Sequence, residues 1–132
     1  MAKEELTINV RTTGVQEVKG HTGTGRMILF DGDADCENFK GKILPGGVDT
    51  QKELDGKFTL SARYILEGKD FEGKDCKIFV ENNGEPGEDG QLKTVPRVLT
   101  DSEALSYLEN KALFGSIEEI PGGVRIHVFS ED

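Results

Sequence analysis

A chain of 132 residues and 14.5 kDa has the usual size of one domain, so we expect residues 1–132 to form a single domain. With 25 acidic and 16 basic residues, the formal charge is −9 and the isoelectric point about 4.7. Such a surface repels phosphate backbones and anionic lipid, which argues against nucleic-acid and membrane partners. Residues 1–10 lack an apolar signal segment, and no stretch reaches the roughly 18 apolar residues of a membrane helix. These features predict a cytoplasmic protein.

Alternation of apolar and polar residues dominates the chain, as in strands with one buried face. It predicts strands at 6–11, 26–30, 39–44, 58–67, 76–82, 92–99, 112–117 and 124–129. Most of the 17 glycines fall between these runs, where turns need positive φ angles. Many short strands joined by glycine-rich turns favour an antiparallel sandwich or barrel.

One segment breaks the strand pattern. Residues 100–103 form a capping box, Thr-Asp-Ser-Glu, which predicts a short helix over residues 101–111. The helix has apolar residues at helical spacing and would cover a sheet face or close one end of a barrel; these are Ala104, Leu105 and Leu108.

Cysteine and histidine are scarce. Cys36 and Cys76 lie too far apart for a disulfide framework or zinc knuckle, and we expect reduced, partly buried thiols. His21 and His127 are separated by most of the chain, which argues against a histidine metal site. We therefore expect no metal and no cofactor.

Two loop-like motifs resemble ion sites but lack essential residues. Three alternate aspartates begin at Asp31, yet Cys36 and Lys42 stand where a calcium-binding EF-hand loop needs glycine and glutamate, so we interpret residues 31–35 as an acidic hairpin turn. The glycine-rich segment 20–25 lacks the Gly-Lys-Ser/Thr ending of a phosphate-binding loop and is followed by a strand. We interpret it as a flexible connection, after which Arg26 could face an anion at a barrel mouth.

Polar residues on otherwise apolar strands are stronger candidates, because a buried polar group needs a partner. Arg63 lies in mid-strand and must reach solvent or an anion. Asp49, just past the Pro-Gly-Gly bend at 45–47, is its nearest plausible partner. The two form either a structural ion pair or a catalytic pair, in which Asp49 is the general base and Arg63 holds an anionic substrate.

A second group of residues completes the candidate ligand-binding site. Asn82 and Asn83 precede Gly84 and read most simply as turn formers, and Asn110 reads as a helix cap. No nucleophile elbow, Ser/His/Asp arrangement or CxxC motif is visible in the sequence. The candidate ligand-binding residues are Tyr64, Asn82, Arg97, Tyr107 and Asn110.

Five motifs in this order resemble the bacterial and fungal family called domain of unknown function 3237. They are LPGGVD (44–49), SARYIL (61–66), IFVENNG (78–84), YLENKALFG (107–115) and GGVRIHVF (122–129). The resemblance spans about residues 6–129. It implies an antiparallel β-barrel of about eight strands, akin to lipocalin-like calycin barrels, with one helix near an end. It also implies a recurrent polar pattern at Asp49, Arg63, Asn82 or Asn83, and Asn110, and a family without an agreed activity.

Two classes of function follow. The first is a barrel that binds a small organic molecule, with acid and base chemistry of the isomerase, cyclase or lyase type at Asp49 and Arg63. The second is a non-catalytic structural or protein-interaction module, whose exposed strands would support a homo-oligomer or another partner. The first requires an internal pocket, and the second a filled interior.

Overall fold

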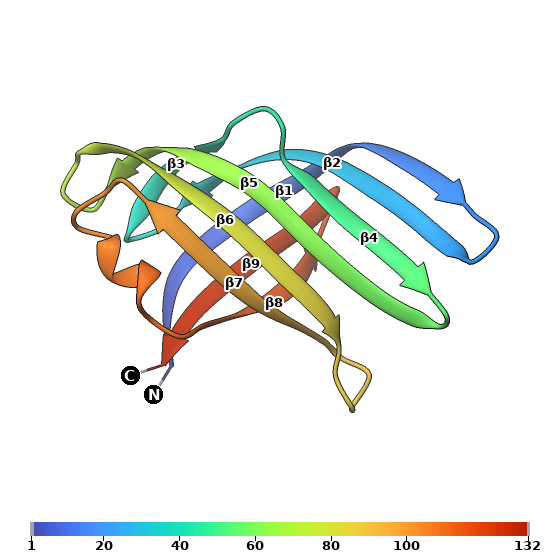
Figure 1. The fold of residues 1–132 in the computed structure, drawn as a ribbon. Helices are drawn as coiled ribbons and strands as arrows, with labels where there is room; N and C mark the ends of the chain where they lie inside the picture. Colours follow the sequence, from blue (N-terminus) through green and yellow to red (C-terminus); the bar gives the residue numbers. More distant parts are fainter. Residues whose placement is uncertain (1, 132) are drawn as a thin grey trace.

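The computed structural model describes residues 2–131, which form nine antiparallel strands and one 3₁₀ helix (Figure 1). The strands are β1 (Ala2–Lys19), β2 (Gly23–Asp35), β3 (Phe39–Ile43), β4 (Val48–Leu54), β5 (Lys57–Asp70), β6 (Asp75–Pro86), β7 (Leu92–Thr100), β8 (Leu113–Ile120) and β9 (Gly123–Glu131). The 3₁₀ helix, η1, spans Ser106–Glu109. Within the described part of the chain, no helix has the length and apolar composition needed to cross a membrane.

The sheet closes on itself as a barrel. Neighbouring strands follow the order β1-β9-β8-β7-β6-β5-β3-β2, and β1 also pairs with β2. β4 pairs with the same neighbours as β3, namely β2 and β5, but nearer the other end of both strands. β3 and β4 therefore share one place in the ring, as a single strand interrupted at residues 44–47. The predicted all-β barrel with about eight strand positions is confirmed.

Alternation explains which residues fill the barrel. Side chains of a strand point alternately to its two faces, so one apolar set per strand meets the others inside. On β5 this set is Leu60, Ala62, Tyr64 and Leu66, all less than 10% exposed. Matching sets from β1, β6 and β9 are equally buried, and they form one core cluster with Ala62, Tyr64 and Leu66 of β5.

The interruption between β3 and β4 requires glycine. Gly46 has a φ of 113°, which side chains rarely adopt. A Cβ atom on Gly47 would lie 2.8 Å from the ring of Phe30, so the backbone passes close to the core there. The Pro-Gly-Gly bend thus lets one strand end and the next begin without leaving the barrel wall.

One end of the barrel, at the left of Figure 1, is closed by η1 and a buried carboxylate. Glu5 accepts hydrogen bonds from Ser130 (2.7 Å), Tyr107 (2.8 Å) and Asn38 (3.1 Å). Burial alone would raise the pKa of Glu5, but these donors and Lys3 outweigh it and hold the pKa below its usual value. η1 supplies Tyr107 to this cluster and buries Leu108 against the core.

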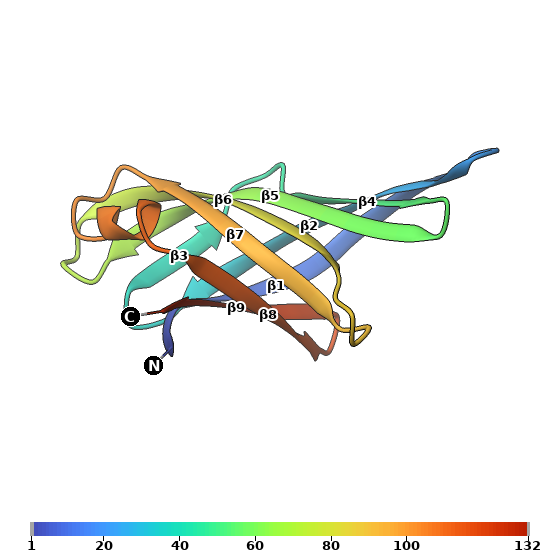
Figure 2. The same cartoon turned by 60° about the horizontal axis from the view of Figure 1, so that its bottom comes forward.

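The opposite end is open. There the β1–β2 and β4–β5 hairpins extend past the other strands, at the right of Figures 1 and 2. β2 pairs with β1 on one side and with β4 on the other over residues 24–29, so the extension is a continuous sheet. Ile28 in the extension and the core residue Phe30 lie on the same face of β2, so the inner wall of the barrel continues onto the extension.

The predicted helix over residues 101–111 is mostly absent, since only residues 106–109 are helical. Side-chain bonds replace the first helical turn. The hydroxyl of Ser102 accepts from the backbone N–H of Leu105 (3.1 Å) and donates to the buried carboxylate of Asp70 (2.7 Å). Asp101 accepts instead from the backbone N–H of Lys77 on β6 (2.8 Å). These bonds hold the segment against the barrel end in a non-helical path.

Two predicted turns are strands. Residues 31–35, interpreted as an acidic hairpin turn, lie within β2, and Asn82 and Asn83 lie within β6. The acidic residues of β2 alternate with Gly32 and Ala34, which face the interior, so the carboxylates point to solvent as strand residues. Asn110 does follow η1 as its C-terminal cap, as predicted.

Candidate functional site

The open end of the barrel contains a cavity of about 250 Å³. Ten of its fourteen lining residues are apolar, and Asp49 is the one lining residue with a formal charge. The lining residues are Val10, Thr12, Ile28, Phe30, Asp49, Gln51, Phe58, Leu60, Ala62, Asn82, Leu92, Ile117, Val124 and Ile126. This is the concave, mainly apolar setting with a few polar groups that small-molecule sites usually have.

Asp49 enters the cavity from β4 with its two carboxylate oxygens in different surroundings. Oδ2 accepts a hydrogen bond from Nε2 of Gln51 (2.9 Å). Oδ1 is buried and has no hydrogen-bond partner among the described residues. Burial raises the pKa of Asp49, and the bond from Gln51 offsets only part of this effect. The cavity therefore holds a carboxyl group that is protonated more easily than a solvated aspartate.

Arg26 fixes the orientation of Gln51. Nη1 of Arg26 donates to Oε1 of Gln51 (3.0 Å), while Nε of Arg26 donates to Glu17 (2.7 Å). A guanidinium can only donate, so the amide oxygen of Gln51 must face Arg26 and its NH₂ group must face Asp49. The chain Glu17–Arg26–Gln51–Asp49 runs along the inner face of the extended hairpins. With each donor in this chain fixed, Oδ2 of Asp49 accepts from the NH₂ group of Gln51.

Asn82 provides the second polar group of the cavity. Its side chain is 1% exposed, and its Oδ1 atom has no hydrogen-bond partner within residues 2–131. In the strand register Asp49 lies opposite Ala62, and Ala62 lies opposite Asn82. The carboxylate and the amide thus flank a methyl group in one row across β4, β5 and β6. The small side chain of Ala62 leaves space between them.

Tyr64 lies deeper, two residues further along the inner face of β5. Its ring meets Phe30 edge to face, with centroids 5.5 Å apart and planes at 75°. The hydroxyl is buried with no partner among the described residues, and burial strongly raises its pKa. Phe30 lines the cavity and Tyr64 backs it, so the inner boundary of the cavity is aromatic.

The predicted pairing of Asp49 with Arg63 is wrong. Arg63 lies opposite Val48, one residue from Asp49, and successive strand residues point to opposite faces. Its side chain is 61% exposed on the outer surface and pairs with Glu81 at 3.1 Å. There it borders an outer groove of about 700 Å³ together with Lys52 and Lys93. Arg63 thus lies on the opposite face of the barrel wall from the carboxylate that it was predicted to assist.

The second group of predicted residues is divided among three places. Asn82 lines the cavity and Tyr64 lies behind it, as described above. Arg97 and Asn110 are exposed and border a separate outer groove of about 350 Å³. Tyr107 donates to Glu5 at the closed end of the barrel. The predicted ligand-binding role of each residue stays untested, but only Asn82 and Tyr64 adjoin the cavity with Asp49.

Sequence reasoning missed Gln51, and it noted Arg26 only as a residue facing a barrel mouth. Gln51 and Glu53 alternate with Thr50 and Lys52 in a run with almost no apolar residues, so β4 had no recognisable strand pattern. The available signal was the Asp-Gly pair at 55–56, directly before the strand of residues 58–67, because Asp-Gly is a typical hairpin turn. Both residues have positive φ angles in the structure. That turn marks a hairpin, and its first strand must be β4.

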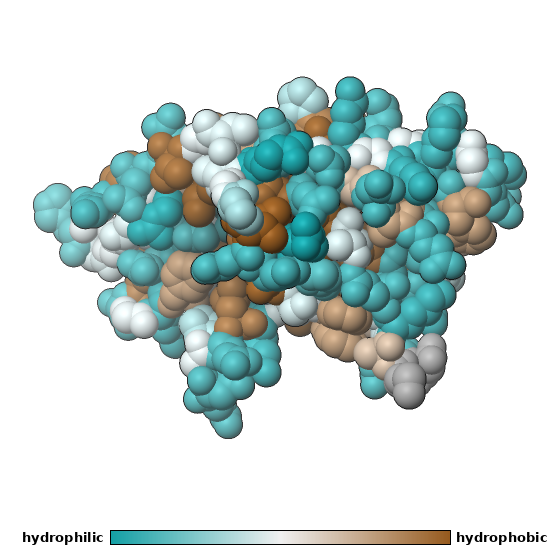
Figure 3. Space-filling view, turned by 180° about the vertical axis from the view of Figure 1, so that it is seen from behind, coloured by the Kyte–Doolittle hydropathy of each residue, from teal (hydrophilic) through white to brown (hydrophobic). Residues whose placement is uncertain are grey.

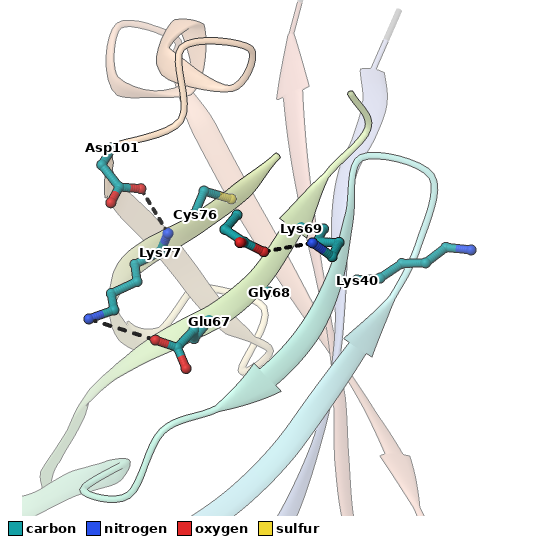
Figure 4. Close-up of a pocket in the computed structure, with 8 residues that line it drawn as sticks. Lys40, Glu67, Gly68, Lys69, Cys76, Lys77 and Asp101 are labelled. Atoms are coloured by element: carbon teal, nitrogen blue, oxygen red, sulfur yellow. Dashed lines mark hydrogen bonds and ion pairs between the residues drawn. The ribbon is translucent and has the colours of Figure 1, made fainter. Parts of the chain in front are cut away.

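A larger hollow of about 650 Å³ lies on the outer surface over β3, β5 and β6 (Figure 4). Its charges neutralise one another. Lys69 pairs with Asp75 at 2.7 Å and Lys77 with Glu67 at 3.7 Å, while Lys40 extends away from the group. These ion pairs are exposed and contribute little to stability. The hollow is a solvated groove between surface side chains, and none of its lining residues has a buried polar atom without a hydrogen-bond partner.

Other reactive side chains do not join the cavity. His127 bonds to Glu4 (2.7 Å) and Glu118 (2.9 Å) on the outer face, and these bonds raise the pKa of His127 despite its partial burial. Cys36 and Cys76 are free thiols. Within residues 2–131, no three histidine, cysteine, aspartate or glutamate side chains gather as a metal site requires.

Comparison of the sequence with known proteins gives a partial match. No family model matches the chain. A UPF0311 protein from Clostridium acetobutylicum is 41% identical over 69 residues, which are 52% of this chain and 37% of that protein. The chain therefore matches well under half of that relative's length. The resemblance to domain of unknown function 3237 stays a prediction.

Solved structures share the whole fold. A protein of unknown function from Clostridium acetobutylicum aligns over 100% of this chain and 99% of its own, with a TM-score of 0.82 and 26% identity. A β-barrel-like protein from Acinetobacter baumannii aligns over 98% of this chain and 94% of its own, with a TM-score of 0.74 and 18% identity. An enzyme from Penicillium herquei aligns over 100% of this chain and 94% of its own, with a TM-score of 0.76 and 15% identity. The last two show the fold alone.

Proposed function

We propose that this barrel binds one small, mainly apolar organic molecule in the cavity at its open end, and that Asp49 is its polar anchor. The observation that supports this most directly is the buried Oδ1 atom of Asp49, which has no hydrogen-bond partner in the described chain. A carboxylate oxygen in apolar surroundings costs free energy until something bonds to it. A ligand that enters from the open end supplies that bond.

The cavity limits the ligand to a small molecule. Its volume of about 250 Å³ lies just below the roughly 300–1,000 Å³ of pockets that hold drug-sized ligands. The ten apolar lining residues favour an apolar body, because transfer of apolar surface out of water drives binding. Asp49 and Asn82 then orient that body by its polar group.

Acid and base chemistry at Asp49 is the finer part of the proposal. The raised pKa brings the protonated and ionised forms of Asp49 closer in population near neutral pH, which general acid and base catalysis requires. A single carboxyl group of this kind suits proton transfer in a reaction of the isomerase, cyclase or lyase type. One structural neighbour is described as an enzyme, which is consistent with catalysis on such a barrel.

Filling the cavity tests the proposal. In an Ala62→Leu variant, the added side chain occupies the space between Asp49 and Asn82. We screen a library of small neutral fragments against both proteins by thermal shift and proton NMR. Fragments that stabilise the unaltered protein should lose at least about tenfold in affinity for the variant.

Arg63→Ala is the matched control, because Arg63 follows Ala62 on the same strand but faces solvent. Its fragment affinities should equal those of the unaltered protein. Equal binding to the Ala62→Leu variant would place the fragments elsewhere and refute the proposed site. Absence of any binding fragment would refute the proposed function.

A further inference from the structure

The charges around the cavity define the polar group of its ligand. We propose that the cavity selects a molecule with a hydrogen-bond donor head group, an alcohol or an amine, on an apolar body, and that it rejects carboxylates and phosphates. This inference rests on the proposed function and specifies its ligand class.

Two polar atoms of the cavity lining are buried without a partner among the described residues, and both are acceptors when Asp49 is ionised. They are Oδ1 of Asp49 and Oδ1 of Asn82, which approach from strands on either side of Ala62. An acceptor gains a hydrogen bond only from a donor, and an ionised carboxylate forms its strongest bonds with cationic donors. A hydroxyl or ammonium group above Ala62 can therefore satisfy both atoms.

No lining residue is a cation that could hold an anionic head group. The nearest cation along the side-chain network is Arg26, and it already bonds to Glu17 and Gln51. A carboxylate placed beside Asp49 would meet a like charge in apolar surroundings, where such pairs are strongly unfavourable. The predicted role of an arginine in holding an oxyanion thus has no counterpart in the cavity.

The locked amide of Gln51 makes this selection reversible by mutation. Because the NH₂ group of Gln51 always faces residue 49, an asparagine at that position must present its oxygen to Gln51. Its own NH₂ group then replaces Oδ1 at the cavity. The Asp49→Asn variant would therefore offer a donor where the unaltered protein offers an acceptor, with almost no change in shape.

Four probes with one ring and different head groups test the inference. They are cyclohexylmethylamine, cyclohexylmethanol, cyclohexanecarboxylate and methylcyclohexane, each titrated at pH 7.5 and followed by NMR chemical shifts. We expect the amine and the alcohol to bind the unaltered protein at least about tenfold more tightly than the carboxylate. In Asp49→Asn, the amine should lose about tenfold and the carboxylate should gain relative to it.

The outcomes separate this inference from the proposed function. If the carboxylate binds the unaltered protein as tightly as the amine, the ligand class is wrong while the binding site stands. If a folded Asp49→Asn variant binds the probes in the same order of affinity as the unaltered protein, the ligand class is also wrong. If none of the four probes binds, including the headless methylcyclohexane, the cavity is not a binding site and both ideas fail. The order in the unaltered protein decides the question even if the variant does not fold.

Discussion

Asp49 combines two features that are seldom found together: one oxygen is held by a fixed donor, and the other is buried without a partner. The fixed donor makes the carboxyl group asymmetric. When Asp49 is protonated, its proton must lie on Oδ1, because Oδ2 accepts from Gln51. The proton that can be exchanged therefore faces the cavity, and Gln51 acts as a positioning residue for it.

Replacing Gln51 with leucine tests this role at the level of one carboxyl group. Burial raises the pKa of Asp49, and the bond from Gln51 lowers it, so the Gln51→Leu variant should have a still higher pKa at Asp49. The carboxyl carbon resonance of Asp49, followed by NMR as a function of pH, measures this directly. Gln16→Leu is the control, because Gln16 is an exposed glutamine of the same extended sheet. An unchanged or lower pKa in Gln51→Leu would contradict the positioning role.

The sign of the pH dependence follows from the raised pKa. Folding makes the ionised form of Asp49 less favourable, so Asp49 reduces stability at pH values above its folded pKa. This unfavourable contribution is absent below the ordinary pKa of an aspartate, where the group is protonated in both states. A buried group that opposes folding at neutral pH is a common property of functional sites.

At the scale of elements, β3 and β5 approach so closely that glycine is required on both. Gly41 lies opposite Gly68, and a Cβ atom on Gly68 would lie 2.0 Å from the backbone oxygen of Lys40. No side chain can rotate away from such a contact, since both atoms belong to the backbone. The pair therefore fixes how tightly the wall bends at the closed end of the barrel.

A Gly68→Ala variant should lower the free energy of unfolding by about 1–3 kcal/mol, because overpacking against backbone forces the strands apart. Gly25→Ala is the matched control, since Gly25 also lies within a strand but a Cβ atom there meets nothing within 4 Å. Urea denaturation measures both. Equal stability of the two variants would show that β3 and β5 separate without cost.

Sequence patterns predicted the elements with one apolar face and missed those defined by polar contacts. The alternation in residues 58–67 and 124–129 leads directly to β5 and β9, because burial of one face produces it. β4 and the non-helical path at residue 101 depend on hydrogen bonds to residues far away in the sequence, such as those from Arg26 to Gln51 and from Lys77 to Asp101. A pattern of neighbouring residues contains no information on such bonds. Asp49 and Asn82 were predicted as polar residues in a barrel, but the face occupied by Arg63 depends on a register that the sequence does not reveal.

At the scale of the whole molecule, the two ends of the barrel have different roles. The closed end satisfies its buried carboxylate, Glu5, with three donors. The open end leaves its buried carboxylate, Asp49, half satisfied. The carboxylate with three donors thus lies at one end of the barrel and the candidate site at the other.

A Tyr107→Phe variant tests this separation. Loss of the hydroxyl removes one donor from buried Glu5, so we expect the free energy of unfolding to fall by about 1–3 kcal/mol. Affinity for the cyclohexyl probes should stay within about twofold, since Tyr107 lies at the far end from the cavity. Ala62→Leu serves as the reciprocal control, because it fills the cavity and should lose affinity for the same probes. A large loss of affinity in Tyr107→Phe would restore Tyr107 as a ligand-binding residue.

The outer surface carries exposed apolar side chains on several strands, among them Ile65 and Leu99, which flank Phe79 in one row across β5, β6 and β7. Seen from behind, hydrophobic residues are interspersed with hydrophilic ones (Figure 3). The most exposed apolar side chains, Val18 at 71% and Val95 at 65%, belong to separate strands, β1 and β7. A homo-oligomer or a protein partner therefore stays a prediction from the sequence, as does a cytoplasmic location.

The interruption between β3 and β4 divides the wall of the barrel into two lengths. β3 supports the closed end, and β4 carries Asp49 and Gln51 at the open end, with a glycine bend between them. β4 therefore supplies the carboxylate of the cavity and the amide that orients it, while the apolar lining comes from the strands that form the barrel core. On a scaffold of this kind, exchange of two side chains of one short strand can change the polar group that is recognised and leave the apolar lining as it is.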